Sequence, residues 1–299
     1  MPGNDFQRDF DSLVPGRAQP GGATRRAALQ TALGVGYAAA AAPLMAQTAI
    51  HTTAEGLDAS RISYTVAGFD VPAYVAAPTG KTGLPVVLVV QEIFGVHEYI
   101  ADICRRLARL GYLAIAPELY ARQGDASKYT EIGKLMSELV SKVPDAQVLA
   151  DLDGALAWAG AHGGDTSRAA ITGFCWGGRI AWLYAAQGPV KAAVAWYGRL
   201  VGQGSPLTPR QPVELAAQLK APVLGLYGGA DSGIPLDTID TMKKALAAGS
   251  AAARASQFHV YPEAGHAFHA DYRPSYRKEA AEDGWKRMLD WFKEHGVAS

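Results

Sequence analysis

The stretch that decides the fold is Ala169-Ala170-Ile171-Thr172-Gly173-Phe174-Cys175-Trp176-Gly177-Gly178-Arg179-Ile180-Ala181. An apolar, strand-like run leads into a Gly-x-Cys-x-Gly-Gly turn, and a helix-like run begins at once. This is the pattern of a nucleophile elbow, with cysteine where serine is usual. The turn is tight, and side chains two residues before and after the nucleophile would collide with neighbouring elements, which explains the glycines. The pattern predicts a nucleophilic Cys175; a buried structural cysteine is the alternative.

The position of Cys175 suits this chemistry. Free N–H groups and the helix dipole favour a thiolate at the start of a helix. The backbone N–H of Trp176 would point at a developing oxyanion. The second cysteine, Cys104, lies in a helical pattern and is expected to pack as a small apolar residue. Two cysteines without a CxxC or Cys/His cluster predict neither a disulfide framework nor a zinc site.

Strand-like and helix-like segments alternate from Arg61 to the end of the chain. Expected strands cover 62–66, 71–76, 86–90, 113–116, 169–173, 192–196, 223–227 and 257–261, and expected helices cover 99–110, 128–139, 145–162, 178–187, 236–248 and 276–295. Residues 67–70 are expected to form a hairpin and 199–220 a loop. The alternation predicts a single α/β domain over 61–299, with a mostly parallel central sheet, helices on both faces and antiparallel strands at one edge.

Two later loops supply candidates for an acid and a base. Asp231 lies in a glycine-rich loop directly after the expected strand 223–227, and His266 follows a glycine after the expected strand 257–261. The order nucleophile, acid, histidine is typical of the α/β-hydrolase fold. We therefore expect Asp231 to orient His266, and His266 to handle the thiol proton and later activate water. His269 is the rival base, and a metal site of His266, His269 and Asp271 is an alternative that lacks further ligands nearby.

Four segments together resemble the dienelactone hydrolase (carboxymethylenebutenolidase) family, over about residues 62–292. They are Gln91-Glu92-Ile93-Phe94-Gly95; Pro117-Glu118-Leu119-Tyr120-Ala121-Arg122; Gly173-Phe174-Cys175-Trp176-Gly177-Gly178 with Trp196-Tyr197-Gly198; and Gly265-His266-Ala267-Phe268. The resemblance implies the α/β-hydrolase fold. It also implies hydrolysis of a carboxylic ester or lactone of the dienelactone type, through a Cys175-Asp231-His266 triad and a thioester acyl-enzyme.

The same resemblance implies roles for further residues. Glu92 would contact the resting thiol and help to activate it, and the backbone N–H of Ile93 would be the second oxyanion donor beside that of Trp176. Arg122 and Tyr197 would bind substrate, Arg122 through a carboxylate. A second carboxylate-binding arginine of the family falls here on Ala270, and Arg273 follows three residues later. This departure leaves the dienelactone substrate itself open. A general carboxylesterase or thioesterase, or a non-catalytic binding protein on the same scaffold, are the alternatives.

Composition and the first residues bear on partners and location. Lys plus Arg equals Asp plus Glu, at 28 each, so no long-range field favours nucleic acid. Arg25-Arg26, a mild Ala-rich stretch and small residues near Ala42 and Ala46 resemble a twin-arginine signal. We expect a disordered segment and signal over 1–46 and a linker over 47–60. We expect the mature protein to be periplasmic or secreted, with a cytoplasmic location as the alternative. We also expect a monomer or small homo-oligomer that has no cofactor and no stable membrane span.

Overall fold

The computed structural model describes residues 49–298. The predicted signal over 1–46 lies outside the described residues, as do the first two residues of the predicted linker over 47–60. Within the described range, no helix combines the length and apolar character that crossing a membrane requires.

Eight strands of the described chain form one sheet in the order β1-β2-β4-β3-β5-β6-β7-β8. The strands are β1 (Leu57–Val66), β2 (Phe69–Pro78), β3 (Leu84–Val90), β4 (Leu113–Pro117), β5 (Gly164–Phe174), β6 (Ala192–Trp196), β7 (Val223–Gly228) and β8 (Gln257–Tyr261). β1 and β2 form an antiparallel hairpin, and β2 also pairs antiparallel with β4. Every other pair is parallel. The predicted single α/β domain, with an antiparallel edge on a parallel sheet, is confirmed.

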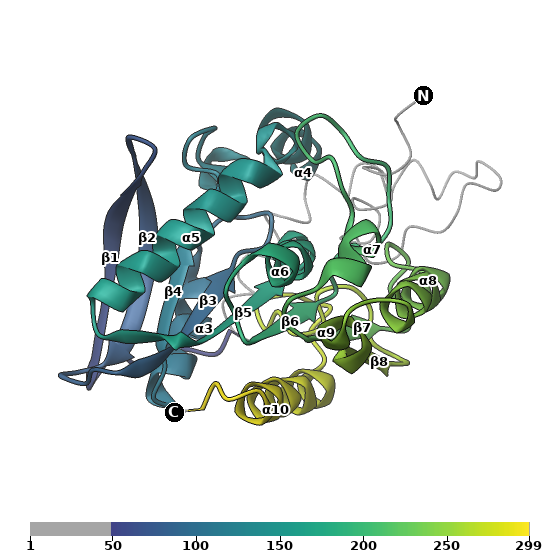
Figure 1. Ribbon diagram of the computed structural model, residues 1–299. Coiled ribbons are helices and arrows are strands. Elements are labelled where there is room, and N and C mark those ends of the chain that lie inside the picture. The colour runs from purple at the N-terminus through teal and green to yellow at the C-terminus, as the bar shows by residue number, and fades with distance from the viewer. Residues whose placement is uncertain (1–48, 299) are drawn as a thin grey trace.

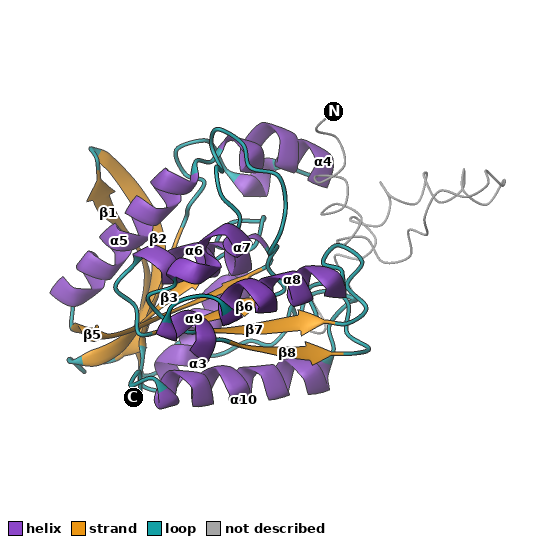
Figure 2. Ribbon diagram, turned by 45° about the vertical axis from the view of Figure 1, so that its right-hand side comes forward, coloured by secondary structure: helices purple, strands orange, loops and turns teal. Residues whose placement is uncertain are grey.

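Helices cover both faces of this sheet (Figures 1 and 2). They are α3 (Glu98–Arg109), α4 (Ile132–Lys134), α5 (Asp145–Ala161), α6 (Trp176–Gln187), α7 (Pro212–Leu215), α8 (Leu236–Ala247), α9 (Ala251–Ala255) and α10 (Lys278–Glu294). Figure 2 shows α8 and α10 on opposite sides of β7 and β8. Because both faces are covered, β3 is apolar along its whole length and every one of its residues is buried.

Several elements differ from the sequence-based expectations. β1 begins at Leu57, inside the predicted linker and ahead of the domain start expected at 61. The β1–β2 hairpin turns on two residues, Ala67 and Gly68, which both have positive φ. The expected helix over 128–139 is a series of short turns, with 3₁₀ turns at Ala126–Lys128 and Val140–Lys142, α4, and a π turn at Leu135–Leu139. Hydroxyls in this region donate to main-chain carbonyls four residues back, which competes with a regular helix.

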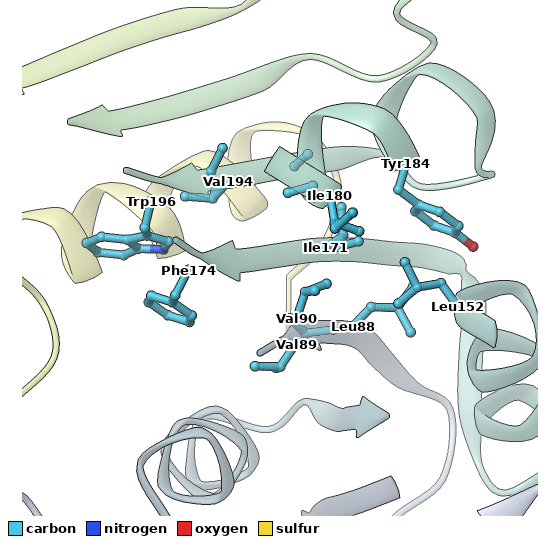
Figure 3. Packing of buried hydrophobic residues seen from close by; sticks show 14 of the residues in the cluster. Leu88, Val89, Val90, Leu152, Ile171, Phe174, Ile180, Tyr184, Val194 and Trp196 are labelled. Atoms are coloured by element: carbon cyan, nitrogen blue, oxygen red, sulfur yellow. The ribbon is translucent and has the colours of Figure 1, made fainter. Parts of the chain in front are cut away.

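The hydrophobic core lies on both sides of the central strands. Figure 3 shows Leu152 of α5 with Ile180 and Tyr184 of α6 near the β3 and β5 side chains Leu88 and Ile171. At the carboxyl end of the strands, the rings of Phe174 and Trp196 stack with centroids 5.5 Å apart. Aromatic packing therefore continues up to the edge of the sheet where the loops begin.

The segment just before β1 is fixed to α3 by hydrogen bonds. Arg105 Nε donates to the Thr52 carbonyl at 2.7 Å, and the Thr52 N–H donates to Asp102 Oδ1 at 2.5 Å. Arg109 donates to the carbonyls of Thr53 and Glu55. We call this contact between residues 50–55 and α3 the N-terminal clasp. It covers a carboxylate, that of Asp102, which is completely buried.

Beneath the clasp, Arg106 joins two buried carboxylates. Its Nε donates to Asp102 and its terminal nitrogen to Asp271, each at 2.5 Å. Asp271 also accepts a backbone hydrogen bond from Ile50. Asp271 lies in the loop that follows β8 and carries both candidate histidines, so α3, this loop and the N-terminal clasp form one connected polar network.

Candidate active site

The order of the strands gathers the predicted site residues at one edge of the sheet. Cys175 follows β5 in the centre, flanked by Glu92 after β3 on one side and Tyr197 after β6 on the other. Asp231 follows β7 and His266 follows β8. The carboxyl ends of parallel strands meet at a single edge, and ligand sites of open α/β sheets lie there. Segments far apart in the sequence therefore converge around one cysteine.

The turn at Cys175 has the geometry of a nucleophile elbow. Its φ of 57° and ψ of −115° are sparsely populated for a residue with a side chain. A Cβ on Gly177 would lie 2.5 Å from the carbonyl oxygens of Val90 and Gln91. One on Gly178 would lie 2.5 Å from that of Trp196. The glycines let the start of α6 pack against the ends of β3 and β6, which holds the partly exposed Cys175 between them.

Asp231 and His266 are brought together as the sequence predicts. His266 Nδ1 lies 2.7 Å from Asp231 Oδ2, and the other carboxylate oxygen accepts the Gly233 N–H at 2.9 Å. Burial lowers the pKa of His266, but the charges of Asp231 and Cys175 outweigh it and hold this pKa well above its usual value. His266 Nε2 has no hydrogen-bond partner within residues 49–298. The imidazole is thus oriented by Asp231 and presents its second nitrogen toward Cys175.

The rival histidine, His269, lies in a different environment. It is 3% exposed, and its Nδ1 is hydrogen-bonded to the Tyr99 hydroxyl at 2.6 Å. Burial and the nearby Arg106 lower its pKa to about 3, which keeps the ring neutral. Asp231 thus pairs with His266 and not with His269. The described residues contain no cluster of three or more His, Cys, Asp or Glu side chains that could hold a metal.

Two backbone N–H groups near Cys175, those of Ile93 and Trp176, donate no hydrogen bond within residues 49–298. Trp176 is the first residue of α6, and the first N–H groups of a helix have no acceptor within the helix. Ile93 is buried on the segment after β3, and its N–H donates to no acceptor in the described chain. The contact of Gly177 with Gln91 places the start of α6 against this same segment. Ile93 and Trp176 therefore lie on the β3 side of Cys175.

Glu92 is buried and held by groups that the sequence did not reveal. Its Oε2 accepts the Tyr272 hydroxyl at 2.6 Å and lies 3.6 Å from His97 Nε2. Burial alone would raise the pKa of Glu92, but His97, Arg273 and Tyr272 together lower it to about 2. Its Oε1 has no partner in the described part of the chain. In the sequence, only proximity could have indicated these contacts: His97 follows Glu92 by a few residues, and Tyr272 follows His266 by a few residues.

The two candidate arginines occupy different places. The guanidinium of Arg122 forms an ion pair with Asp151, donates to the Val66 carbonyl at 3.1 Å and lies over the Phe69 ring. It is thereby tied to α5 and to the β1–β2 hairpin. The guanidinium of Arg273 lies 5.0 Å from the centre of the Phe94 ring and interacts with the charges of Glu92 and Cys175. The structure thus brings Arg273 into the site.

Tyr197 is completely buried beside the base. Its φ is 40°, and its ring meets the His266 ring edge-on with centroids 5.1 Å apart. Its hydroxyl has no regular hydrogen bond in the described chain. On the other side of Cys175, Tyr120 packs edge-on against Trp176 with centroids 4.9 Å apart. The sequence contained Tyr120 within a recognised segment but gave it no role.

The sheet order, the elbow at Cys175 and the acid and histidine loops define an α/β-hydrolase, and the structural likeness to solved hydrolases agrees. A family model described as the dienelactone hydrolase family matches residues 71–296. The chain belongs to the dienelactone hydrolase family and is a hydrolase.

Named relatives match most of the chain. A Methylorubrum extorquens protein with the provisional name carboxymethylenebutenolidase is 60% identical over 291 residues, which cover 97% of this chain and 99% of the relative. An Escherichia coli K12 protein with the same provisional name is 58% identical over 263 residues, 87% of this chain and 96% of the relative. A Klebsiella pneumoniae crystal structure, provisionally described as a dienelactone hydrolase, is 60% identical with a TM-score of 0.77 and covers 80% of this chain and 99% of its own.

Proposed function

We propose that the chain hydrolyses a carboxylic ester or lactone through nucleophilic attack by Cys175. The observation that carries this proposal is the pairing of Asp231 with His266 at 2.7 Å, which leaves His266 Nε2 directed toward a cysteine on a strained elbow. A nucleophile, a base within its reach and an acid that orients the base form the arrangement that covalent acyl transfer requires. The provisional name of the relatives, carboxymethylenebutenolidase, is consistent with this reaction.

The proposed reaction has two halves. Cys175 Sγ, whose proton is held by His266 Nε2, bonds to the carbonyl carbon, and the carbonyl electron pair moves to oxygen beside the N–H groups of Ile93 and Trp176. Cleavage of the ester C–O bond leaves a thioester, and His266 returns the proton to the departing oxygen. Water, deprotonated by His266, then attacks the thioester and releases the carboxylic acid and the free thiol. Asp231 stabilises the imidazolium that forms in each half.

Arg273 supports a substrate that carries a carboxylate. Arg273 lies over Phe94 and close to Cys175, so its guanidinium can pair with an anionic group of a bound substrate. Glu92 is ionised, and its Oε1 has no hydrogen-bond partner among the described residues. Its role in activating the thiol stays a prediction. Substrate binding by Arg122 also stays a prediction, because its guanidinium is already paired with Asp151.

The test is hydrolysis of a dienelactone, a neutral lactone, a p-nitrophenyl ester and a thioester by the wild type and by three variants. Cys175→Ala should abolish every activity. Arg273→Ala should lower kcat/KM for the dienelactone more than for the neutral lactone, and the same selective loss in Arg122→Ala would place Arg122 at the substrate as well. Preference for the thioester would favour the thioesterase alternative. Undiminished hydrolysis by Cys175→Ala would refute the proposed nucleophile.

We also propose that Arg25-Arg26 and the following Ala-rich stretch direct export by the twin-arginine route. Replacing both arginines by lysine should keep the protein in the cytoplasm, as followed by fractionation of cells that express the full chain. Export that is unchanged by this substitution would favour another route, and a wild type found only in the cytoplasm would refute export.

A further inference from the structure

Buried polar atoms without partners are concentrated around Cys175. Nine buried side-chain nitrogen or oxygen atoms have no hydrogen-bond partner within residues 49–298. Six of them lie at the carboxyl edge of the sheet, in Gln91, Glu92, His97, Tyr120, Tyr197 and His266. Most buried polar groups in proteins are hydrogen-bonded, and an unpaired one carries a desolvation cost. A group of such atoms around a nucleophile indicates that a bound ligand supplies their partners.

The proposed reaction accounts for only some of these atoms. His266 Nε2 handles the proton, and Glu92 and His97 face each other at 3.6 Å. Tyr197 packs against the base. Three groups have no part in that reaction, the hydroxyls of Tyr197 and Tyr120 and the amide nitrogen of Gln91, and the last two lie side by side.

Neighbouring contacts fix Tyr120 and Gln91. Tyr120 is 2% exposed, and its ring is held edge-on by Trp176. Gln91 Oε1 accepts the Leu119 N–H at 3.3 Å, which leaves the amide nitrogen as a free donor. The amide lies beside the Tyr120 hydroxyl, but the two form no hydrogen bond of regular geometry. The Gln91 amide nitrogen and the Tyr120 hydroxyl thus lie side by side, and neither has a regular hydrogen bond within residues 49–298.

The strand order sets which part of a substrate would meet these donors. Tyr120 follows β4 and Gln91 follows β3, whereas His266 follows β8 on the opposite side of Cys175. The departing oxygen of an ester must lie at His266 to receive its proton. With the departing oxygen at His266, the acyl part of an ester can extend toward β4, the side on which Tyr120 lies. Tyr120 also interacts electrostatically with Cys175, which keeps it within the surroundings of the reacting atom.

We propose that Tyr120 and Gln91 form a specificity subsite that binds an acceptor oxygen, an oxo or carboxylate oxygen, on the acyl chain of the substrate. The inference rests on the proposed ester hydrolysis and adds the substrate class to it. A site whose buried donors are satisfied only by the right substrate discriminates strongly against an analogue that lacks the acceptor. Loss of one neutral hydrogen bond to such a group corresponds to a decrease of about tenfold in kcat/KM.

The experiment compares p-nitrophenyl esters of three acyl groups, pentanoate, 4-oxopentanoate and the succinate half-ester. The quantity measured is the ratio of kcat/KM for each oxygen-bearing ester to that for pentanoate. We expect ratios above one in the wild type and a decrease of about tenfold in Tyr120→Phe. The matched control is Tyr112→Phe, which removes another buried tyrosine hydroxyl, one that donates to Val297 at the opposite end of β4. Its ratios should equal those of the wild type.

The two substituted esters separate the possible acceptors. A decrease for 4-oxopentanoate alone assigns an oxo oxygen to the subsite, and a decrease for the succinate ester alone assigns a carboxylate. Ratios that are unchanged in Tyr120→Phe, with activity still dependent on Cys175, would refute the subsite and leave ester hydrolysis standing. Hydrolysis that is independent of Cys175 would refute the proposed function and with it the subsite. Thermal melting of both tyrosine variants checks that each is folded.

Discussion

Replacing Glu92 by glutamine tests the electrostatics at the centre of the site. The pKa of this carboxyl falls from 4.5 to about 2 on folding. Burial opposes that decrease, and the contacts with His97 and Arg273 cause it. Because the folded pKa is the lower one, the stabilisation is fully present above about pH 5 and is lost as the pH falls toward 2. The full effect is about 3 kcal/mol.

The expected result is a difference in pH dependence between the two proteins. Between about pH 7 and about pH 3.5, the wild type should lose about 1 kcal/mol more free energy of unfolding than Glu92→Gln. The measurement is urea unfolding of both proteins at a series of pH values. Glu138→Gln, which changes an exposed carboxylate in the same way, is the control. Parallel pH curves for the wild type and Glu92→Gln would refute the assignment of Glu92 as a stabilised carboxylate.

Three further predictions concern the site and its support. His269→Gln should keep kcat/KM within a few-fold and leave its pH profile unchanged, because the His269 ring is neutral and buried. His266→Gln should lower kcat/KM by about a thousandfold or more. Equal losses in the two variants would contradict the assignment of His266 as the base. Gly177→Ala should lower the free energy of unfolding by about 1–3 kcal/mol, because its Cβ would lie 2.5 Å from backbone oxygens; an unchanged denaturation midpoint would show that the turn can widen. Arg106→Leu should lower the free energy of unfolding by about 3 kcal/mol, because Asp102 and Asp271 would stay buried and each would lose its ion pair with this guanidinium. A melting temperature equal to that of the wild type would disprove this.

Sequence patterns predicted the parts of the site that depend on local geometry. The elbow was recognisable because a tight turn between strand and helix requires glycines beside Cys175. Asp231 and His266 were found because each follows a buried strand, and parallel strands end at a common edge. The structure brings these two side chains together at 2.7 Å. Continuous apolar runs in the sequence likewise predicted buried strands such as β3.

Contacts that depend on tertiary packing could not be derived in this way. The pairing of Arg122 with Asp151 joins a loop to α5, and the hydrogen bond of Tyr272 to Glu92 joins residues 180 positions apart. No period or spacing encodes either contact. Residues 128–139 were expected to form one helix, but the structure has several short turns there. The hydroxyl of Ser137 donates to a main-chain carbonyl in this region, and such local competition is not visible in a sequence pattern.

The N-terminal clasp sets a limit on how the chain can be shortened. Trimming that stops before Ile50, including a cut after Ala42 or Ala46, leaves every bond of the clasp in place. A shortened chain that starts after Glu55 would expose Asp102 and remove one donor from Asp271, next to the residue that holds Glu92. Purification tags and fusion partners therefore belong upstream of residue 50, and a recombinant protein cut to the first strand would be a poor standard for the activity of the enzyme.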